Sequence, residues 1–401
     1  MISVGVDVSK EKSMICMLKP YGEVVASPYE ISHTEQDLSK LIETIKAINE
    51  EIVVVMEATG GYHLPVLKKL IEADIFVSVI NPLVMKKYSQ VALRKGKSDK
   101  LDSVMIASYG LDNWFKLQEY ISPDEVYSEL KLLGRQYDYY MKLKVQGKVS
   151  LTNMLDKTMP GIKALIRSRQ AIRPTKDKLN DFVKKYWHYD NITKMSENKF
   201  IKHYCTWAKK KGYHAQTDKA KDIYALANQG IPTLSSKTAS TKMLVLESVR
   251  VLSEVNKTLE IIITRMQELA SILPEYDVVI NMQGVGDILA PRLIAEIGDA
   301  RRFHSSKALI AYAGIDSPPY QSGNFYSTQR KISKRGSGSL RKTGFEIMKC
   351  LKNNKPTQDS AVYDYMIKKE NEGKHKKCAK IAALNKFLRI YYARVMEVYA
   401  Q

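Results

Sequence analysis

The sequence has no run of 18 consecutive apolar residues, which excludes a conventional membrane-spanning helix. Its first residues, Met1-Ile2-Ser3-Val4-Gly5-Val6-Asp7, lack the layout of a secretory signal peptide. Cysteine is scarce too, and Cys16, Cys205, Cys350 and Cys378 form no CxxC pair and have no histidine at ligand spacing. This scatter argues against a zinc site and indicates free thiols in a reducing compartment. We therefore expect a soluble, cytoplasmic protein with no membrane partner.

Acidic residues are few relative to basic ones. The chain of 401 residues has 43 Asp and Glu against 63 Lys and Arg, a net charge of +20 and a pI near 9.5. Such an excess predicts attraction to polyanions, most plausibly nucleic acid, and says nothing about the fold. With 44% hydrophobic residues the chain can build real cores, and its length predicts two or three domains.

Hydrophobic periodicity predicts an α/β domain in the first 115 residues. The expected strands are residues 2–8, 13–18, 23–26, 52–56 and 76–80, and the expected helices are residues 35–49, a segment that ends near 73, and a segment that begins at 98. The unbroken, mostly β-branched run Ile52-Val53-Val54-Val55-Met56 is typical of a strand buried on both faces at the centre of a sheet. This order predicts a mixed sheet with helices.

Four carboxylates occupy positions where such a fold can bring them together. Asp7 lies near the end of the first strand and Glu57 follows the central strand, and sites of α/β sheets gather outside the carboxyl ends of strands. Asp99 and Asp102 share one face in the first turn of a helix that Ser98 is suited to cap. Oxygen-only ligands suit Mg²⁺ or Mn²⁺, and two such ions are the usual clamp at a phosphodiester.

Each of these acids also has a purely structural interpretation. Asp7 can be a turn residue at the end of a strand, and Glu57 an acid at the start of a helix. Asp99 and Asp102 can be a solvated acidic first turn that suits the helix dipole. The metal-site hypothesis is favoured because all four acids being incidental is the less plausible alternative.

The middle of the chain is predicted to be helical. Apolar stripes over about 124–156 and 244–273 need a partner helix, so these segments pair either with each other or with a second subunit. Residues 160–240 between them are rich in lysine with interleaved aromatic residues, as in Lys184-Lys185-Tyr186-Trp187-His188-Tyr189. Two interpretations stay open here, a surface that stacks on single-stranded bases and an ordinary helical insertion with an aromatic core.

The C-terminal third has a helix, a Gly284-Val285-Gly286 turn and a second apolar helix within residues 280–298. This is a helix-hairpin-helix pattern, in which the turn offers N–H groups to a DNA phosphate, or else a plain interhelical turn. A basic, serine-rich stretch follows, and its candidate phosphate contacts are Arg330, Lys331, Lys334, Arg335, Arg341 and Lys342. Residue chemistry alone does not single out Ser322 among the many serines, because no base stands at a diagnostic spacing.

Several of these segments together resemble one protein family. They are Val4-Gly5-Val6-Asp7-Val8-Ser9-Lys10, Glu57-Ala58-Thr59-Gly60-Gly61-Tyr62, Val79-Ile80-Asn81-Pro82 and Lys97-Ser98-Asp99-Lys100-Leu101-Asp102. In order and spacing they are similar to the DEDD insertion-sequence transposases, also called bridge-RNA-guided recombinases, whose RNase-H-like domain resembles Holliday-junction resolvases. The resemblance implies that Asp7, Glu57, Asp99 and Asp102 bind metal. Tyr320-Gln321-Ser322-Gly323 looks like the serine motif of the family, which implies that Ser322 is the nucleophile.

The resemblance covers most of the chain except about 160–240 and implies three parts. These are an RNase-H/RuvC-like domain at 1–117, a helical coiled-coil region with the basic insertion at 118–275, and a mostly helical transposase domain at 276–401. It implies a homodimer or higher homo-oligomer in a bacterial or archaeal nucleoid that cuts and rejoins the DNA of its own element and of a target under a guide RNA. Two rivals stay open, a metal-dependent nuclease or junction resolvase that uses water, and a non-catalytic nucleic-acid-binding protein.

Overall fold

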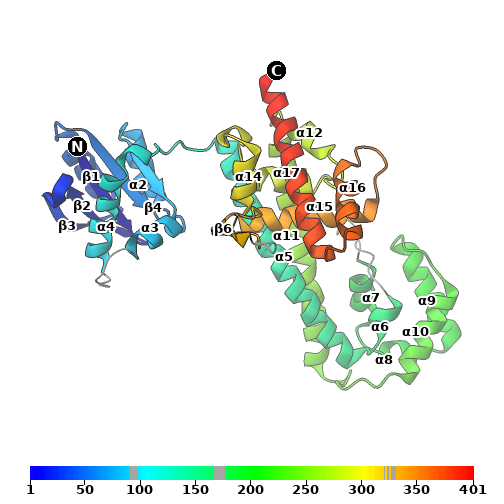
Figure 1. The fold of residues 1–401 in the computed structure, drawn as a ribbon. Coiled ribbons are helices and arrows are strands. Elements are labelled where there is room, and N and C mark those ends of the chain that lie inside the picture. The colour runs from blue at the N-terminus through cyan, green and yellow to red at the C-terminus, as the bar shows by residue number, and fades with distance from the viewer. Residues whose placement is uncertain (91–97, 167–176, 320, 323–324, 327–330) are drawn as a thin grey trace. The chain divides into compact units, whose positions relative to one another are not determined.

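The structure is a computed structural model that describes the chain except residues 91–97, 167–176, 320, 323–324 and 327–330 (Figure 1). It divides into two compact units, Met1–Ser122 and Pro123–Gln401. No helix in the described part of the chain is long and apolar enough to cross a membrane.

The first unit is built on a five-stranded mixed sheet. In the order β3-β2-β1-β4-β5, the strands are Val24–Ser32, Lys12–Leu18, Ile2–Val8, Ile52–Glu57 and Val77–Ile80. β2 is antiparallel to β1 and β3, whereas β4 is parallel to β1 and β5. The expected α/β domain with a mixed sheet is confirmed. β3 extends six residues beyond the predicted strand at 23–26 and includes Pro28.

Helices cover both faces of this sheet. α1 (Glu35–Lys46) and α2 (Leu64–Glu72) bury their apolar residues against one face, and α3 (Pro82–Ser89) and α4 (Asp99–Asp112) pack on the other. The sequence analysis missed α3. It treated Asn81-Pro82 only as the end of a strand, although Asn81 caps the helix by accepting a hydrogen bond from the Leu83 N–H at 2.9 Å.

Two long helices form the frame of the second unit. α5 (Glu125–Thr158) and α11 (Ala239–Ser271) lie side by side in Figure 1. Of the two alternatives left open by the sequence, pairing of the two stripes with each other is the one seen within this chain, and pairing with a second subunit stays a prediction. The predicted α11 stripe is only partly buried. Leu259 and Met266 face the core, whereas Leu244 is 47% and Val251 is 49% exposed.

The described residues between α5 and α11 form five helices. They are α6 (Ile162–Leu165), α7 (Lys178–Tyr186), α8 (Asp190–Thr193), α9 (Glu197–Lys210) and α10 (Thr217–Gln229). Their aromatic residues form one cluster, in which Phe182, Tyr186 and Trp207 contact one another at centroid distances of 4.8 to 6.2 Å. Tyr186 and Tyr204 are fully buried and Trp207 is 9% exposed. The base-stacking interpretation of these rings is therefore wrong, since they fill a core.

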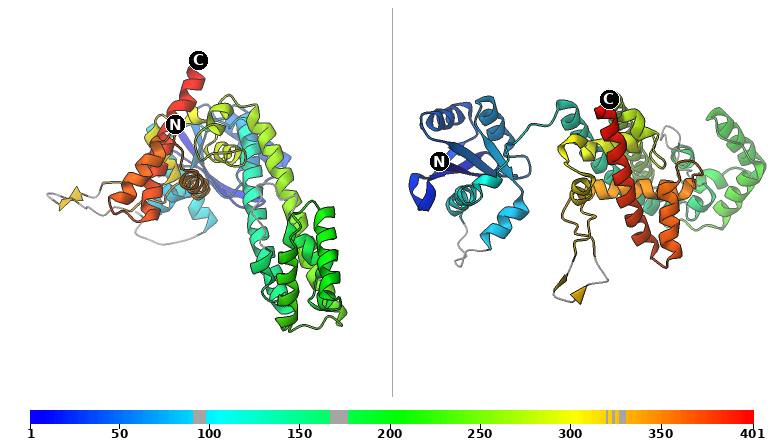
Figure 2. Two further views of the ribbon diagram at one scale, coloured as in Figure 1. Left: turned by 90° about the vertical axis from the view of Figure 1, so that its right-hand side faces the viewer. Right: turned by 45° about the horizontal axis from the view of Figure 1, so that its top comes forward.

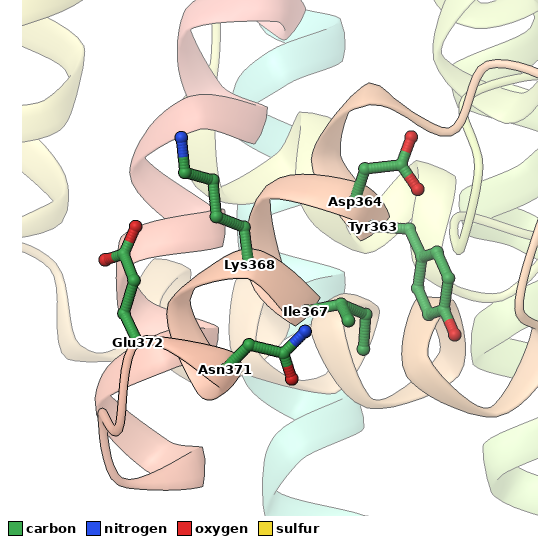
Figure 3. Close-up of a pocket in the computed structure, with 6 residues that line it drawn as sticks. All are labelled: Tyr363, Asp364, Ile367, Lys368, Asn371 and Glu372. Carbon is green, nitrogen blue, oxygen red and sulfur yellow. The ribbon is translucent and has the colours of Figure 1, made fainter.

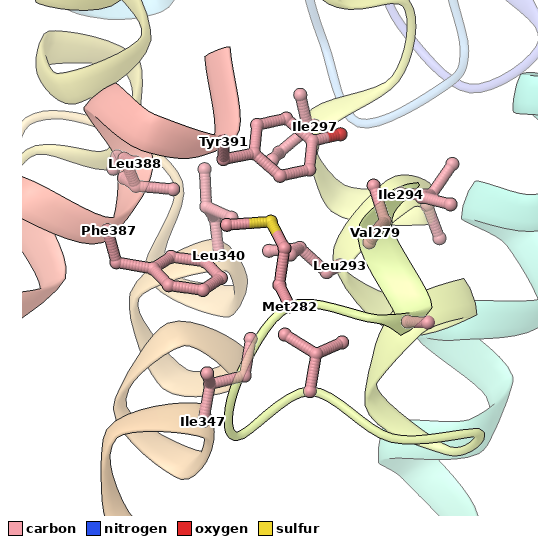
Figure 4. Packing of buried hydrophobic residues seen from close by; sticks show 14 of the residues in the cluster. Val279, Met282, Leu293, Ile294, Ile297, Leu340, Ile347, Phe387, Leu388 and Tyr391 are labelled. Atoms are coloured by element: carbon pink, nitrogen blue, oxygen red, sulfur yellow. The ribbon is translucent and has the colours of Figure 1, made fainter. Parts of the chain in front are cut away.

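The helices after α11 pack around the ends of α5 and α11. Their helices are α12 (Tyr276–Ile280), α13 (Leu289–Ile297), α14 (Ser306–Ala313), α15 (Gly338–Asn354), α16 (Ala361–Asn371) and α17 (Lys376–Ala400). Figure 4 shows how Met282, from the turn after α12, lies between the apolar residues of α13, α15 and α17. The helix-hairpin-helix pattern predicted at 280–298 corresponds to α12, which ends at Ile280, a turn and α13.

Candidate active site

The sheet places two of the predicted acids on neighbouring strands. β1 and β4 pair in parallel with Val6 opposite Met56, so the next residues along the two strands are Asp7 and Glu57. Side chains alternate along a strand, and therefore Asp7 lies on the same face as Gly5, and Glu57 on the same face as Val55. Both acids are half-buried at the carboxyl edge of the sheet.

Helix α4 brings the other two acids to this edge. A Cβ added to Gly5 would lie 2.2 Å from the Ser103 carbonyl oxygen, and one added to Gly110 would lie 2.1 Å from Ser3 Oγ. The helix therefore rests directly on the face of β1 that carries Asp7, and it runs antiparallel to that strand. Its first turn reaches the carboxyl edge, where Ser98 caps it by accepting from the Leu101 N–H at 3.3 Å.

The charges at this edge act on one another. Burial raises the pKa of the Glu57 carboxyl, and the nearby negative charge of Asp102 raises it further. On the other side of the edge, a hydrogen bond to Glu30 at 2.6 Å raises the pKa of Lys12, and Asp99 adds to this effect. We name the edge formed by Asp7, Glu57, Asp99 and Asp102 the acid edge.

The acid edge suits a divalent cation in its chemistry. It offers carboxylate oxygens, which Mg²⁺ and Mn²⁺ prefer. The pKa of Glu57 is raised mainly by burial and further by the charge of Asp102, and a cation would compensate this second effect. Within the described residues, however, no three His, Cys, Asp or Glu side chains stand close enough together to hold a metal ion. The fold brings the four acids to one edge and one face, and their action as metal ligands stays a prediction.

The serine motif lies on an arm between α14 and α15. At its base Gly314 and Gly336 approach so closely that a Cβ on Gly336 would lie 2.0 Å from the Tyr312 carbonyl oxygen. The Lys334 N–H donates to the Gly314 carbonyl at 3.0 Å, and the Arg341 guanidinium donates to the carbonyls of Ala313 and Gly336 at 2.9 and 3.1 Å. These contacts fix both ends of the arm at one point.

Beyond this base the arm carries two short paired strands. β6 (Gln321–Ser322) and β7 (Phe325–Tyr326) are antiparallel, with Ser322 opposite Phe325. In Figure 2 the two strands, drawn in gold, lie away from the helices of the second unit. The predicted nucleophile is therefore carried on a projecting arm rather than in the helical core.

The predicted phosphate contacts differ in their surroundings. Lys331, Lys334 and Arg335 are exposed near the base of the arm, whereas Arg330 lies outside the described residues. The Arg341 guanidinium is engaged by backbone carbonyls, and Lys342 Nζ lies 2.7 Å from Asp138 Oδ1. Internal partners thus account for Arg341 and Lys342, while Lys331, Lys334 and Arg335 stay available to an external anion.

The Gly284-Val285-Gly286 turn has a packing reason for its first glycine. Gly284 has a φ of +83°, and a Cβ there would lie 2.9 Å from Leu351 Cβ and 3.0 Å from the Ile347 carbonyl oxygen of α15. Gly286 faces open space. Phosphate binding at Gly284 and Gly286 stays a prediction, since the close packing on α15 is sufficient reason for Gly284.

Sequence reasoning assigned no role to a set of cations on α17. Lys377, Lys386 and Arg389 lie on the helix face that turns toward Lys331 and Lys334, about fifty residues earlier in the chain, and all five line one hollow. The signal in the sequence was the basic character of the last helix, with cations at 377, 386 and 389, but it gives no hint of the distant partners.

Comparisons with known proteins agree with the positions of the motifs. Residues 4–160 match the profile of the DEDD transposases of the IS110 type, and residues 276–363 match that of the transposase IS116/IS110/IS902 family. The pilin gene-inverting protein of Moraxella bovis is 22% identical over 98% of this chain and 95% of its own. That of Moraxella lacunata is 23% identical over 86% of this chain and 80% of its own.

Two solved structures of RuvC from Thermus thermophilus are also similar. The free protein is 16% identical with a TM-score of 0.23, and covers 28% of this chain and 95% of its own. The second, a complex with a Holliday junction substrate, is 14% identical with a TM-score of 0.23, and covers 29% and 96%. The two family profiles span more than half of the sequence and include both the acid edge and the serine arm. The chain therefore belongs to the IS110-type family of DEDD transposases.

Proposed function

We propose that this transposase cuts and rejoins DNA at the ends of its insertion sequence, with the acid edge activating the phosphodiester and Ser322 as nucleophile. The observation that carries the proposal is the convergence of Asp7, Glu57 and the first turn of α4 on one face and one edge of the sheet. Burial and the charge of Asp102 raise the pKa of the half-buried Glu57, so its ionised form is unfavourable for the fold, as expected where charge serves a function.

The four acids would hold divalent ions, Mg²⁺ or Mn²⁺ and two in number as in related chemistries. Ions bound there supply Lewis-acid polarisation of the scissile phosphate and stabilise the leaving oxygen. The contribution of the chain is positional, because β1, β4 and α4 fix three backbone segments against one another. Close packing at Gly5 and Gly110 leaves α4 no freedom to slide along the sheet.

Ser322 acts from the arm. Its hydroxyl oxygen forms a bond to phosphorus while the bond from phosphorus to the leaving sugar oxygen breaks. The serine proton, carried by solvent, ends on that leaving oxygen and gives a free sugar hydroxyl. The resulting protein–DNA ester conserves the energy of the broken bond, so that a second sugar hydroxyl can attack it and rejoin the strand without ATP. The acids of one subunit acting with Ser322 of another would explain why the two groups belong to different compact units.

The relatives support rejoining as well as cutting. Their printed name describes inversion of a pilin gene, and an inversion requires that the same strands be cut and joined again. The DNA partners are the element ends and the target. A structured guide RNA is the further partner that we propose, because the net charge of +20 exceeds what a catalytic site alone requires.

The test is a strand-exchange reaction stopped with denaturant, in which a protein–DNA adduct is separated by gel. Wild-type protein with Mg²⁺ should give an adduct and joined product, and Ser322→Ala should give neither. The matched control is Ser196→Ala, since Ser196 is exposed and makes no capping hydrogen bond to α9.

Two results would contradict the proposal. Cleavage by Ser322→Ala at the wild-type rate, without an adduct in either protein, would indicate water as the nucleophile and a resolvase-like nuclease. Binding without any cleavage, unaltered by Glu57→Gln or Asp102→Asn, would indicate a non-catalytic nucleic-acid-binding protein.

A further inference from the structure

A groove of 1070 Å³ runs between the base of the arm and helix α17 in the second unit. Its lining residues include six cations and no acid. The cations are Lys331, Lys334, Lys374, Lys377, Lys386 and Arg389. They come from two segments separated by about forty residues and meet only in the folded chain. We call this feature the α17 groove.

Within the described residues, carboxylates act on the cations of the α17 groove at longer range than an ion pair, as Glu372 does on Lys374. Among the residues that the structure describes, none of the six makes an ion pair. Neighbouring cations of the same unit do, as in the pairs of Lys352 with Glu370 and of Arg394 with Asp359. The groove thus concentrates positive charge that repels itself and that an external polyanion would stabilise.

Two of the cations are held in place by uncharged partners. Lys386 Nζ donates to the Ala361 carbonyl at 2.9 Å and lies 5.2 Å from the centre of the Tyr365 ring. Arg389 Nε donates to Asn385 Oδ1 at 3.1 Å. These contacts orient the two side chains without neutralising their charge, as expected of groups that are preorganised for an anion.

The floor of the α17 groove is apolar. Phe345 from α15, Tyr365 from α16 and Ile381 from α17 line it and are half-buried. A duplex would present only its phosphate edges to such a groove and leave the floor uncovered. Bases of a single strand can lie on aromatic and aliphatic side chains while their phosphates reach surrounding cations.

We propose that the α17 groove binds a single-stranded segment of nucleic acid and leads it to the base of the serine arm. Six positive charges exceed the charge of about −2 on one phosphate monoester, so several consecutive phosphates are needed to balance them. The groove proposal rests on the proposed function only where it makes the bound strand part of the strand-exchange complex. DNA and RNA share the chemistry that the groove recognises, so the test includes both.

A second hollow of the same unit, at α16, lacks the features that make the α17 groove a candidate binding site. It measures about 510 Å³ and is lined by residues of α16 and the turn after it, all drawn in Figure 3. Its charges alternate, since Lys368 lies one helical turn from both Asp364 and Glu372. No other element contributes to it, and it therefore has neither the charge nor the converging walls of the α17 groove.

The experiment measures binding of full-length protein to fluorescent single strands by anisotropy, with chelator present so that no cleavage occurs. The probes are a mixed-sequence DNA, the RNA of the same sequence and the DNA duplex, at several salt concentrations. The test variant is Lys377→Gln/Lys386→Gln/Arg389→Gln. A second variant, Lys377→Arg/Lys386→Arg, keeps the charge. The matched control is Lys199→Gln/Lys202→Gln/Lys209→Gln, which removes three exposed cations from α9.

We expect the test variant to weaken single-strand binding by about tenfold or more, and to lower the slope of log K against log salt by about 2, or 0.7 for each lost phosphate contact. The arginine variant and the α9 control should bind like wild type. The probe, DNA or RNA, whose affinity falls more in the test variant identifies the kind of strand that the α17 groove binds. An equal loss in the α9 control, unchanged binding in the test variant, or a loss confined to the duplex would each overturn the proposal.

Failure here is distinguishable from failure of the proposed function. If the test variant binds normally while adduct formation still requires Ser322, only the groove proposal is wrong. If Ser322→Ala cleaves normally while the test variant loses single-strand binding, the groove stands and the serine chemistry is wrong. Melting temperature and far-ultraviolet circular dichroism of each variant separate loss of contact from loss of fold.

Discussion

The acid edge and the α17 groove collect charge of opposite sign by different structural means. At the acid edge, backbone pairing between β1 and β4 and the contact of α4 with Gly5 fix the backbone positions of the residues that carry the carboxylates. In the α17 groove, long flexible side chains from separate segments meet over an apolar floor. This difference indicates that the acid edge positions its groups precisely, as bond-breaking chemistry requires. It indicates that the α17 groove can adapt to the successive phosphates of a strand.

The sharpest way to break this comparison is to neutralise the acid edge. Asp7→Asn should reduce strand cleavage by about 10³-fold or more, because loss of a metal-binding carboxylate removes several kcal/mol of charge stabilisation in the transition state. The measurement is the initial rate of cleavage with Mg²⁺, and removal of divalent ions should abolish wild-type activity likewise. Glu43→Gln, on the exposed side of α1, is the control and should retain full activity. Wild-type rates in Asp7→Asn would refute a role for this edge.

The positional character of the acid edge can be tested through Gly5. Gly5→Ala forces a Cβ to within 2.4 Å of the Ala107 backbone nitrogen, so α4 must shift. We expect the free energy of unfolding of the first unit to fall by about 3 kcal/mol, measured by urea titration. Gly147→Ala in α5, where the nearest atom would lie 3.5 Å away, should leave stability equal or higher. A Gly5→Ala protein as stable as wild type would show that α4 is not held in place by this contact.

Glu57 provides a test in which stability and activity move in opposite directions. Its pKa is raised in the folded protein by burial and by Asp102, so its ionised form disfavours folding at pH values above the folded pKa. Glu57→Gln should therefore have a higher melting temperature than wild type at neutral pH, and the difference should shrink as pH falls through the folded pKa and Glu57 becomes protonated. The same variant should lose cleavage.

A binding readout completes this test. Mg²⁺ should raise the melting temperature of wild-type protein and have little effect on that of Glu57→Gln. A lower melting temperature in Glu57→Gln, at every pH, would assign Glu57 a structural role instead.

The smallest expected effect compares two cations close in sequence. Arg335 is exposed and has no acidic partner among the described residues, whereas Lys342 is paired with Asp138 at 2.7 Å. Arg335→Gln should lower the salt slope of nucleic-acid binding by roughly 0.7 to 0.9, and Lys342→Gln should leave it unchanged. Equal effects of the two substitutions would show that internal pairing does not decide which cations reach phosphate.

The sequence was most informative where structure is local. Alternation along Ile2, Val4 and Val6 and the unbroken run at 52–56 predicted β1 and β4, and with them the edge where Asp7 and Glu57 lie. Ser98 was predicted as the cap of α4, and its side chain accepts a hydrogen bond there. In each case the residues that determine the element are within one turn or one strand of each other.

Prediction failed where tertiary packing decides. The spacing of Tyr186, Tyr204 and Trp207 does not distinguish a base-stacking surface from a core, because rings beside lysines in the sequence are compatible with both. Only their burial in the structure shows that they form a core. The α17 groove was missed for a related reason. Lys331 and Arg389 are far apart in the chain and become neighbours only when α17 packs beside the base of the arm.

The clamp at Gly314 and Gly336 has a consequence for how this chain can vary. Both ends of the serine arm are held together at Gly314 and Gly336, so the arm can change in length and composition without disturbing α14 or α15. Each doubling of the length of a flexible loop costs only about 0.6 kcal/mol of closure free energy. Related chains could therefore exchange the whole arm. Recombination between relatives would transfer the complete tip that carries Ser322 as long as Gly314 and Gly336 remain at its base.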